Sequence, residues 1–180
     1  MYDDKIYLTR IHLNDWRDNG EEQIEALFEK VGFKIIAPEE HSPCEQIAML
    51  RHCKELATTD GSIAHNAVFC TSGINLTIIR KADYWNSYQE MMNNLANLNV
   101  TFIDAHKSVM VKPNAPWGGP FYLCITSELE KYFNHYIPHL PLLFRMSWLK
   151  YRYKEPLKNI YYTFRAYLGI RTRIHKLFYI

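Results

Sequence analysis

Apolar residues recur in two alternating patterns along residues 5–105 of this chain. Short apolar runs predict strands, and stretches in which apolar residues return every three or four positions predict helices. The predicted strands are residues 5–9, 33–37, 55–59, 75–79 and 100–103. The predicted helices are residues 21–31, a helix that begins at Pro43, residues 63–69 and residues 84–98. This alternation predicts an α/β fold, a Rossmann-like parallel sheet with helices on both faces.

Two of the predicted helices carry strong local signals. Ser42, Pro43 and Glu45 form an N-terminal pattern, with a side-chain cap, a proline in the first turn and a glutamate three residues after the cap. In the last predicted helix, apolar residues recur at alternating spacings of four and three, which predicts that this stripe lies in the core. The members of the stripe are Tyr84, Tyr88, Met91, Leu95 and Leu98.

Candidate chemistry gathers where the predicted strands end. Arg10 follows the first strand, Asp60-Gly61-Ser62 follows the third, and Asp104 follows the fifth. Ligands of such sheets bind beyond the carboxyl ends of the strands, so we expect Arg10 and the turn at residues 60–62 to converge on one cleft. A helix that restarts after a glycine turn presents backbone N–H groups that favour an anion, most often a phosphate. A carboxylate would be unfavourable beside that phosphate, and we expect Asp60 to cap the helix instead.

Charge is distributed unevenly along the chain. Residues 139–180 hold nine Lys or Arg and one acid, a net charge of +8, which leaves −6 of the total +2 for residues 1–138. Aromatic residues alternate with these cations, as is typical of helices at an anionic membrane surface; packing on a neighbouring domain is the alternative. We therefore expect a Rossmann-like domain at residues 1–110, a loop and helix extension at residues 111–138, and a basic aromatic helical tail at residues 139–180.

Cysteine usage and the N-terminal sequence bear on the compartment. Four scattered cysteines without a C-x-x-C pair predict reduced, packed thiols in a cytosolic protein. The N-terminus lacks the apolar segment of a secretory signal, and no apolar run reaches the ~20 residues that span a bilayer. We expect a cytoplasmic protein that is peripheral at the inner face of the membrane through residues 139–180.

Some enzyme classes are disfavoured by missing motifs. No G-x-G-x-x-G follows the first strand, which disfavours a dinucleotide oxidoreductase. No G-x-S-x-G occurs, which disfavours a serine hydrolase with a nucleophile elbow.

Two segments together are more specific than the glycine turn alone. Residues 42–47 read Ser-x-x-Glu-Gln-Ile, and residues 61–69 read Gly-Ser-x-x-His-Asn-x-x-Phe. This pair resembles the second half of family 61 glycosyltransferases, which include bacterial capsular-polysaccharide enzymes, plant xylosyltransferases and the O-GlcNAc transferase of EGF repeats. The resemblance extends over residues 5–105. It implies the C-terminal, donor-binding half of a GT-B fold, and inverting sugar transfer in surface or capsular polysaccharide biosynthesis.

The resemblance also implies which residues contact the nucleotide-sugar donor. In the family, the first strand runs into an arginine, and a second arginine and an Asn-Glu pair follow. The matching residues are Arg10, Arg17, Asn19 and Glu21, although Gly20 separates a pair that is usually adjacent. Guanidinium groups suit the donor diphosphate, and a solvated surface loop is the alternative for this segment. The predicted donor-binding residues are Arg10, Arg17, Asn19, Gln46, Gly61, Ser62, His65 and Asn66.

The roles predicted for Gln46 and His65 rest on separate arguments. The capping pattern does not need Gln46, which leaves its side chain to reach the nucleotide or ribose. His65 precedes the Asn of the motif, and a packing role inside a short helix is its alternative. No D-x-D sequence occurs, which argues against the metal-dependent class of glycosyltransferases, so we expect neither a metal nor another cofactor.

The sequence names no catalytic residue. No side chain is a convincing general base, and the chain begins almost directly at the first strand of the donor-binding half. We therefore expect a fragment, a truncated gene product or one half of a split enzyme. The expected partners are a nucleotide sugar, a glycan or lipid-linked acceptor, a separate N-terminal half or second copy, and an anionic membrane surface, but no nucleic acid. The alternative function is a non-catalytic module that binds a nucleotide or phosphate, or acts as a membrane-associated scaffold.

Overall fold

The computed structural model describes residues 3–13, 18–82, 84, 86–106 and 121–133. Arg17 and the predicted tail at residues 139–180 lie outside the described residues. Asn19 lies in a described strand, but its side chain is not described.

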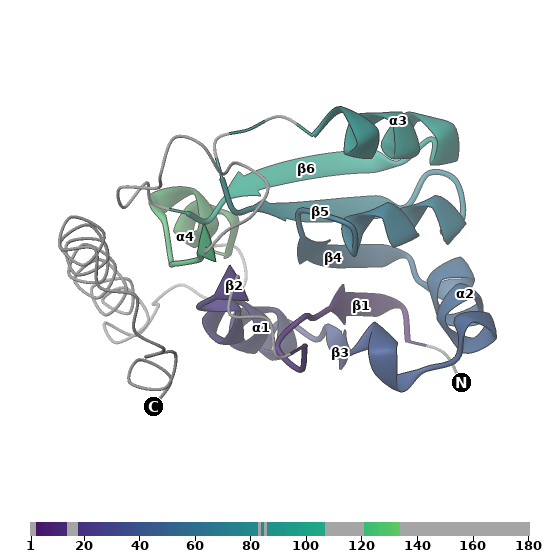
Figure 1. Cartoon of the computed structure of the whole chain (residues 1–180), viewed down its shortest axis with the longest axis horizontal. Helices are drawn as coiled ribbons and strands as arrows, with labels where there is room; N and C mark the ends of the chain where they lie inside the picture. The colour runs from purple at the N-terminus through teal and green to yellow at the C-terminus, as the bar shows by residue number, and fades with distance from the viewer. Residues whose placement is uncertain (1–2, 14–17, 83, 85, 107–120, 134–180) are drawn as a thin grey trace, which may run out of the picture.

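A five-stranded parallel sheet forms the centre of the fold (Figure 1). Its strands are β1 (Lys5–Leu8), β3 (Lys34–Ile36), β4 (Glu55–Thr59), β5 (Asn75–Arg80) and β6 (Asn99–Asp104). They lie in the order β3-β1-β4-β5-β6, and every neighbouring pair is parallel. The predicted α/β class and its Rossmann-like parallel sheet are confirmed.

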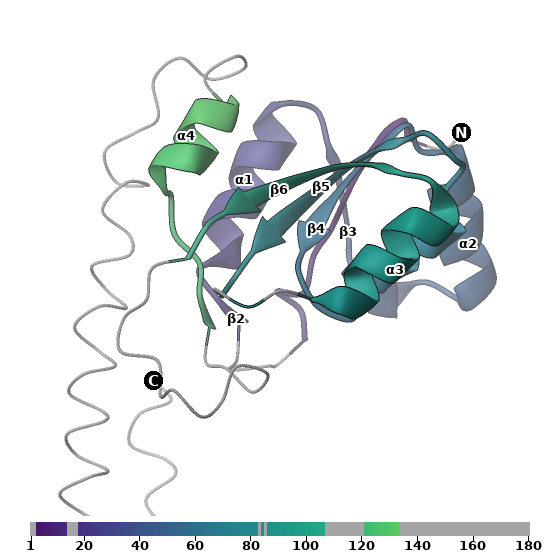
Figure 2. The ribbon, with the colours of Figure 1, turned by 90° about the horizontal axis from the view of Figure 1, so that it is seen from above.

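Helices cover both faces of this sheet (Figure 2). One face carries α1 (Glu21–Lys30) and α4 (Ser127–Phe133), which pack on one buried apolar cluster. The opposite face carries α2 (Pro43–His52), the 3₁₀-helix η2 (Ala64–Phe69) and α3 (Ser87–Ala96). The described residues also include a short 3₁₀-helix, η1 (Pro38–Glu40), and a two-stranded parallel pair of β2 (Asp18–Asn19) with β7 (Phe121–Tyr122).

Strand β1 contributes side chains to two buried apolar clusters, one on each face of the sheet. Successive side chains of a strand point to opposite faces, so Tyr7 enters the cluster beneath α1 while Ile6 and Leu8 enter the cluster beneath α2. Tyr7 is fully buried and stacks near Phe28 of α1, with ring centroids 5.0 Å apart. Because neither face of β1 is left to solvent, its sequence is apolar throughout its centre.

Helix α2 begins as the sequence predicts. The Ser42 hydroxyl accepts a hydrogen bond from the Glu45 N–H at 3.4 Å, and the Glu45 carboxylate accepts one from the Ser42 N–H at 2.8 Å. This reciprocal pair satisfies two N–H groups at the start of the helix. The hydrogen bonds from the Ser42 side chain and backbone lower the pKa of Glu45.

Helix α3 contradicts the predicted core stripe. Tyr88, Met91 and Leu95 are 65%, 55% and 73% exposed, whereas Gln89 and Asn93 on the opposite face of the helix are buried. The Gln89 side-chain amide donates to the Ala64 carbonyl at 3.2 Å and to the Asn93 side-chain oxygen at 2.8 Å. The prediction that this stripe lies in the core is wrong, because a buried amide network docks the polar face of α3 onto η2.

The four cysteines are all free thiols, but the prediction that they are packed is wrong for one of them. Cys44 is exposed, and Cys53, Cys70 and Cys124 are buried. A hydrogen bond between the thiols of Cys53 and Cys70 lowers the pKa of Cys53 and raises the pKa of Cys70. Burial raises the pKa of Cys70 further.

Within the part of the chain that the structure describes, no helix has the length and apolarity needed to cross a bilayer.

Candidate functional site

The carboxyl ends of β1, β4 and β5 meet at one edge of the sheet. The chain leaving β1 crosses one face to β3, while the chain leaving β4 crosses the other face to β5. Neighbouring connections that diverge in this way open a crevice at the strand ends, where doubly wound folds bind their ligands. Arg10 follows β1, Gly61 follows β4 and Lys81 follows β5 at this crevice.

Two cationic side chains approach the Gly61 turn. A Cβ atom placed on Gly61 would lie 3.5 Å from Lys81 Nζ and 4.0 Å from Arg10 Nη1. The expected convergence of Arg10 with the turn at residues 60–62 is therefore confirmed. Gly61 has a φ of +127°, a backbone conformation that side-chain-bearing residues rarely adopt, so glycine serves both the turn and the close approach of the cations.

The turn also presents backbone donors. The N–H of Ala64 donates to the Gly61 carbonyl at 3.0 Å, and the N–H of His65 donates to the Ser62 carbonyl at 3.3 Å. Within the described ranges, the N–H groups of Gly61, Ser62 and Ile63 donate to no backbone carbonyl. These three donors lie beside Gly61, where the two cations converge.

The helix that follows the turn has a smaller dipole than the sequence predicts. Residues 63–69 were expected to form a helix whose dipole favours a phosphate, but η2 is a six-residue 3₁₀-helix. So short a helix carries little dipole, and any anion binding here depends on the individual N–H groups and the cations.

Asp60 does not cap that helix. No side chain caps η2, and the Asp60 carboxylate accepts a hydrogen bond from the Asn86 side-chain amide at 3.1 Å. Asp60 is 4% exposed, and its own N–H donates to the Ile79 carbonyl at 2.9 Å, which continues the pairing of β4 with β5. The predicted cap is wrong because a tertiary partner from the start of α3 holds this carboxylate.

Glu21 positions the segment that carries Arg10. Its buried carboxylate accepts hydrogen bonds from the Tyr7 hydroxyl at 3.0 Å and from the Arg10 N–H at 3.3 Å. Glu21 is the first residue of α1, where the helix dipole favours a negative charge. Thr9 makes a second hydrogen bond to α1, which its hydroxyl donates to the Glu25 carboxylate at 2.7 Å. The backbone at Arg10 is therefore fixed to both the sheet and α1.

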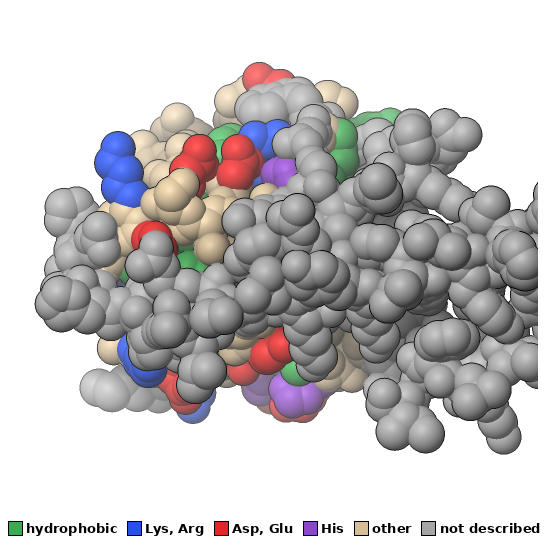
Figure 3. Space-filling model, turned by 90° about the vertical axis from the view of Figure 1, so that its left-hand side faces the viewer, with side chains coloured by type: hydrophobic (Ala, Val, Ile, Leu, Met, Phe, Trp, Pro, Cys, Tyr) green, Lys and Arg blue, Asp and Glu red, His purple; other side chains and the backbone are tan. Residues whose placement is uncertain are grey.

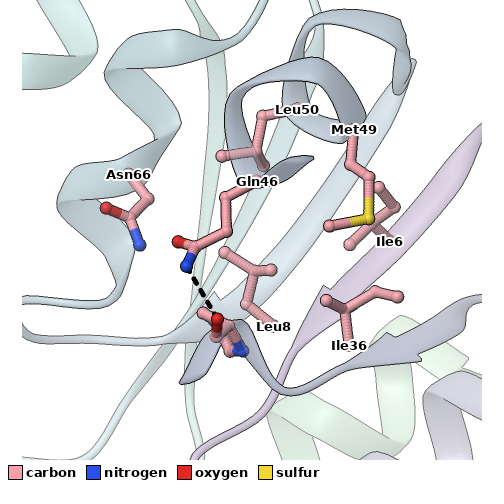
Figure 4. Close-up of a pocket in the computed structure, with 8 residues that line it drawn as sticks. Ile6, Leu8, Ile36, Gln46, Met49, Leu50 and Asn66 are labelled. Atoms are coloured by element: carbon pink, nitrogen blue, oxygen red, sulfur yellow. Dashed lines mark hydrogen bonds between the residues drawn. The ribbon is translucent and has the colours of Figure 1, made fainter. Parts of the chain in front are cut away.

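Gln46 and Asn66 line a separate small hollow of about 10 Å³ between α2, η2 and the strands β1 and β3 (Figure 4). The Gln46 side-chain amide donates to the carbonyls of Pro38 at 2.7 Å and His41 at 2.9 Å. These bonds hold the loop between β3 and α2, so a structural role accounts for the nitrogen of Gln46. The other residues that line the hollow are apolar: Ile6, Leu8, Ile36, Pro38, Met49 and Leu50.

The remaining predicted residues are Ser62, which lies in the turn, and His65, which follows it. Ser62 is exposed at the turn itself. His65 is half-buried on η2, and its Nε2 atom is buried and has no hydrogen-bond partner within the described residues. The donor-binding roles of Arg10, Gln46, Gly61, Ser62, His65 and Asn66 stay predictions.

Charged groups other than the two cations also lie at this end of the sheet. Figure 3 shows basic, acidic and histidine side chains of the described residues close together on this face. Arg80 and Asp104, the last residues of β5 and β6, form an ion pair at 2.9 Å. Asp104 thus fixes two neighbouring strand ends to each other. Among the residues described, no group of three His, Cys, Asp or Glu side chains is placed to hold a metal ion.

Lys81 is the residue that the sequence reasoning missed. The predicted fourth strand ends at Ile79, so the polar residue directly after it is Arg80, whereas β5 extends to Arg80 and places Lys81 after the strand. Lys81 is only 6% exposed, and its ammonium lies 4.8 Å from the centre of the Phe121 ring. Phe121 comes from β7, far along the chain, so no local sequence signal predicted this contact.

One comparison with known proteins finds a family model that matches part of the chain. Residues 3–78 match the family model described as Glycosyltransferase 61. The matched segment contains Arg10, the capping box of α2 and the Gly61 turn, and it ends inside β5. A search of the curated proteins found no match to the chain.

Proposed function

We propose that this chain, of which residues 3–78 match the Glycosyltransferase 61 family model, is a glycosyltransferase that binds the diphosphate of a nucleotide-sugar donor at the carboxyl ends of β1, β4 and β5. The observation that carries the proposal is the approach of Arg10 and Lys81 to Gly61. In this proposal the described domain is the C-terminal, donor-binding half of a GT-B fold.

The chemistry of the site suits a diphosphate. A guanidinium offers paired N–H donors to phosphate oxygens, an ammonium adds a second positive charge, and backbone N–H groups complete an anion site. When the sugar is transferred, negative charge develops on the phosphate that leaves with the nucleotide. Fixed donors and cations stabilise that charge without rearranging. The proposal is accordingly an inverting transfer that needs no metal.

The finer assignments rest on the family. Its bacterial members build capsular polysaccharide, so we propose a surface or capsular glycan, or a lipid-linked sugar, as the acceptor. Residues 139–180, with a net charge of +8, would then hold the protein at the anionic membrane where such polymers are assembled.

Titration calorimetry with uridine diphosphate tests the proposal. We expect binding that is equal with a divalent cation and with EDTA, since cationic side chains and N–H groups neutralise the phosphates. Strict dependence on a divalent metal would contradict the metal-free account, and an absence of binding under both conditions would contradict the donor site itself. Binding without release of nucleotide from a nucleotide sugar, when acceptor glycans are supplied, would favour the non-catalytic module instead.

A further inference from the structure

Two buried cysteines lie side by side where α2 and η2 end. Cys53 directly follows α2 and Cys70 directly follows η2, and both side chains belong to the apolar cluster on that face of the sheet. The hydroxyl of the neighbouring Thr71 donates a hydrogen bond to the Arg51 carbonyl at 2.8 Å, which joins the same two segments of the chain. The two thiols are therefore held at a junction whose backbone is already fixed.

The two sulfur atoms face each other. The Cys53 thiol donates to the Leu50 carbonyl at 3.2 Å, which leaves its sulfur to accept the hydrogen bond from the Cys70 thiol. This bond lowers the pKa of Cys53 and raises the pKa of Cys70. Because the thiolate is the form that peroxides oxidise, Cys53 is the thiol that reacts first, and Cys70, which keeps its proton, reacts second.

The chain between the two cysteines carries the turn at the centre of the candidate site. Residues 53–70 contain β4, the Gly61 turn and η2. A covalent bond between residues 53 and 70 would close this segment into a loop. Such a bond also constrains the unfolded chain, and it stabilises the fold for that reason. The redox state of the pair would thus change the stability of the segment that positions the Gly61 turn.

We propose that Cys53 and Cys70 are a redox modification site, at which hydrogen peroxide converts the two thiols into a reversible disulfide. The Cys53 sulfur gives two electrons to one peroxide molecule and becomes a sulfenic acid, with release of one water. The Cys70 sulfur then attacks the Cys53 sulfur, and the S–S bond forms as the S–O bond breaks. The hydroxide that leaves takes the Cys70 proton and becomes a second water. A dithiol reductant restores both thiols.

Burial limits which oxidant can reach the pair. Cys53 is 2% exposed and Cys70 is 9% exposed, so a peroxide molecule, which is little larger than water, has access that a bulky disulfide lacks. Cys44 is exposed in the first turn of α2, and oxidation there would link one copy of the chain to another. The proposal is therefore specific for a bond within one chain.

Peptide mapping of the wild-type chain tests the proposal. The folded chain is treated with hydrogen peroxide, its remaining thiols are alkylated, and the product is digested with trypsin. Trypsin cleaves after Arg51, Lys54 and Arg80, which places the two cysteines on separate peptides, residues 52–54 and 55–80. We expect these peptides as one linked species, lighter than their sum by two hydrogen atoms. Dithiothreitol added before alkylation should return them to two separate peptides.

Thermal unfolding gives a second readout. After peroxide treatment, the Cys44→Ala chain should unfold ~5–10 °C above the same chain in reductant, the shift expected for a disulfide that closes a short loop. The alanine removes the exposed thiol, so that bonds between copies do not contribute. Cys70→Ser in that background should show no such shift, because the second sulfur is missing. The peptide map of the wild-type chain does not depend on whether this variant folds.

The outcomes decide the proposal without reference to nucleotide binding. Linked peptides that reductant separates support it. It is overturned when peroxide leaves Cys53 and Cys70 as thiols, when either becomes a sulfinic acid without linked peptides, or when the linked partner is Cys44 or Cys124. Each of these results leaves the proposed glycosyltransferase function as it stands, since no nucleotide takes part.

Discussion

Charged side chains are arranged differently at the two ends of the parallel sheet. At the amino end, cations and acids form pairs: Lys5 with Glu55 at 2.8 Å, and Lys54 with Asp4 at 2.8 Å. At the carboxyl end, Arg10 and Lys81 both approach the glycine turn after β4. Both ends use ion pairs to join neighbouring segments of the chain, at the carboxyl end through Arg80 and Asp104, but only the carboxyl end also brings two cationic side chains to a glycine turn among the described residues.

The acids at the carboxyl end sharpen this contrast. Asp60 is adjacent to Gly61 in sequence, yet its carboxylate is held by the Asn86 amide. Glu21 fixes the backbone of Arg10 and the Tyr7 hydroxyl. Both acids thus hold the framework of the crevice in place. The comparison shows that the location of each carboxylate determines the role of the charged residues around it. Such a group of charged residues can stabilise the fold, or it can bind an anion.

The largest effect that separates the two ends is expected at a pair of glycines. Gly61 at the carboxyl end and Gly73 at the amino end both have positive φ, but of the two only Gly61 would bring an added Cβ within 4 Å of other atoms, those of Lys81 and Arg10. Replacing either glycine with valine should lower the free energy of unfolding by roughly 1–3 kcal/mol, because a branched side chain strains this backbone. Only Gly61→Val should also abolish binding of uridine diphosphate, since its side chain fills the space between the two cations.

Urea denaturation and calorimetry on both glycine variants give the two readouts. Retention of nucleotide binding by Gly61→Val, at a level equal to that of Gly73→Val, would show that the space beside the turn is not a ligand site.

A smaller effect is expected from one arginine at each end. Arg10→Ala should weaken binding of uridine diphosphate by ~1.5–3 kcal/mol, the contribution of a hydrogen bond to a charged group. Arg51 is exposed in the last turn of α2, near the amino end of β4, and Arg51→Ala should leave the affinity unchanged. Calorimetric titration of the two variants compares them directly, and equal affinities would remove Arg10 from the site.

Much of the framework was predictable because it rests on local patterns. Strand β4 was predicted with the bounds that it has, and the predicted capping pattern of Ser42 and Glu45 forms a capping box. The carboxyl-end rule correctly brought Arg10 and Gly61 together from positions far apart in sequence, since parallel strands end at one edge.

What escaped prediction was decided by contacts between distant residues. Helices α1 and α3 carry similar apolar stripes, yet Ile24 and Leu27 of α1 are fully buried while Leu95 of α3 is 73% exposed. Apolar spacing predicts that a helix forms, but the hydrogen bonds of Gln89 decide which face of α3 docks. The position of Lys81 was not predicted for a related reason, because its burial depends on contact with Phe121, which is distant in sequence.

The central claim is that a nucleotide diphosphate binds at the turn after β4, and amide NMR spectroscopy tests it most directly. We would titrate uridine diphosphate, in EDTA, into the wild-type chain labelled with ¹⁵N and follow the backbone N–H signals of Gly61, Ser62 and Ile63. The account predicts that these signals shift together along a single saturation curve, while the signal of Gly73 at the amino end stays in place. Saturable shifts confined to Gly73 and its neighbours, or an absence of any shift at the turn, would contradict it.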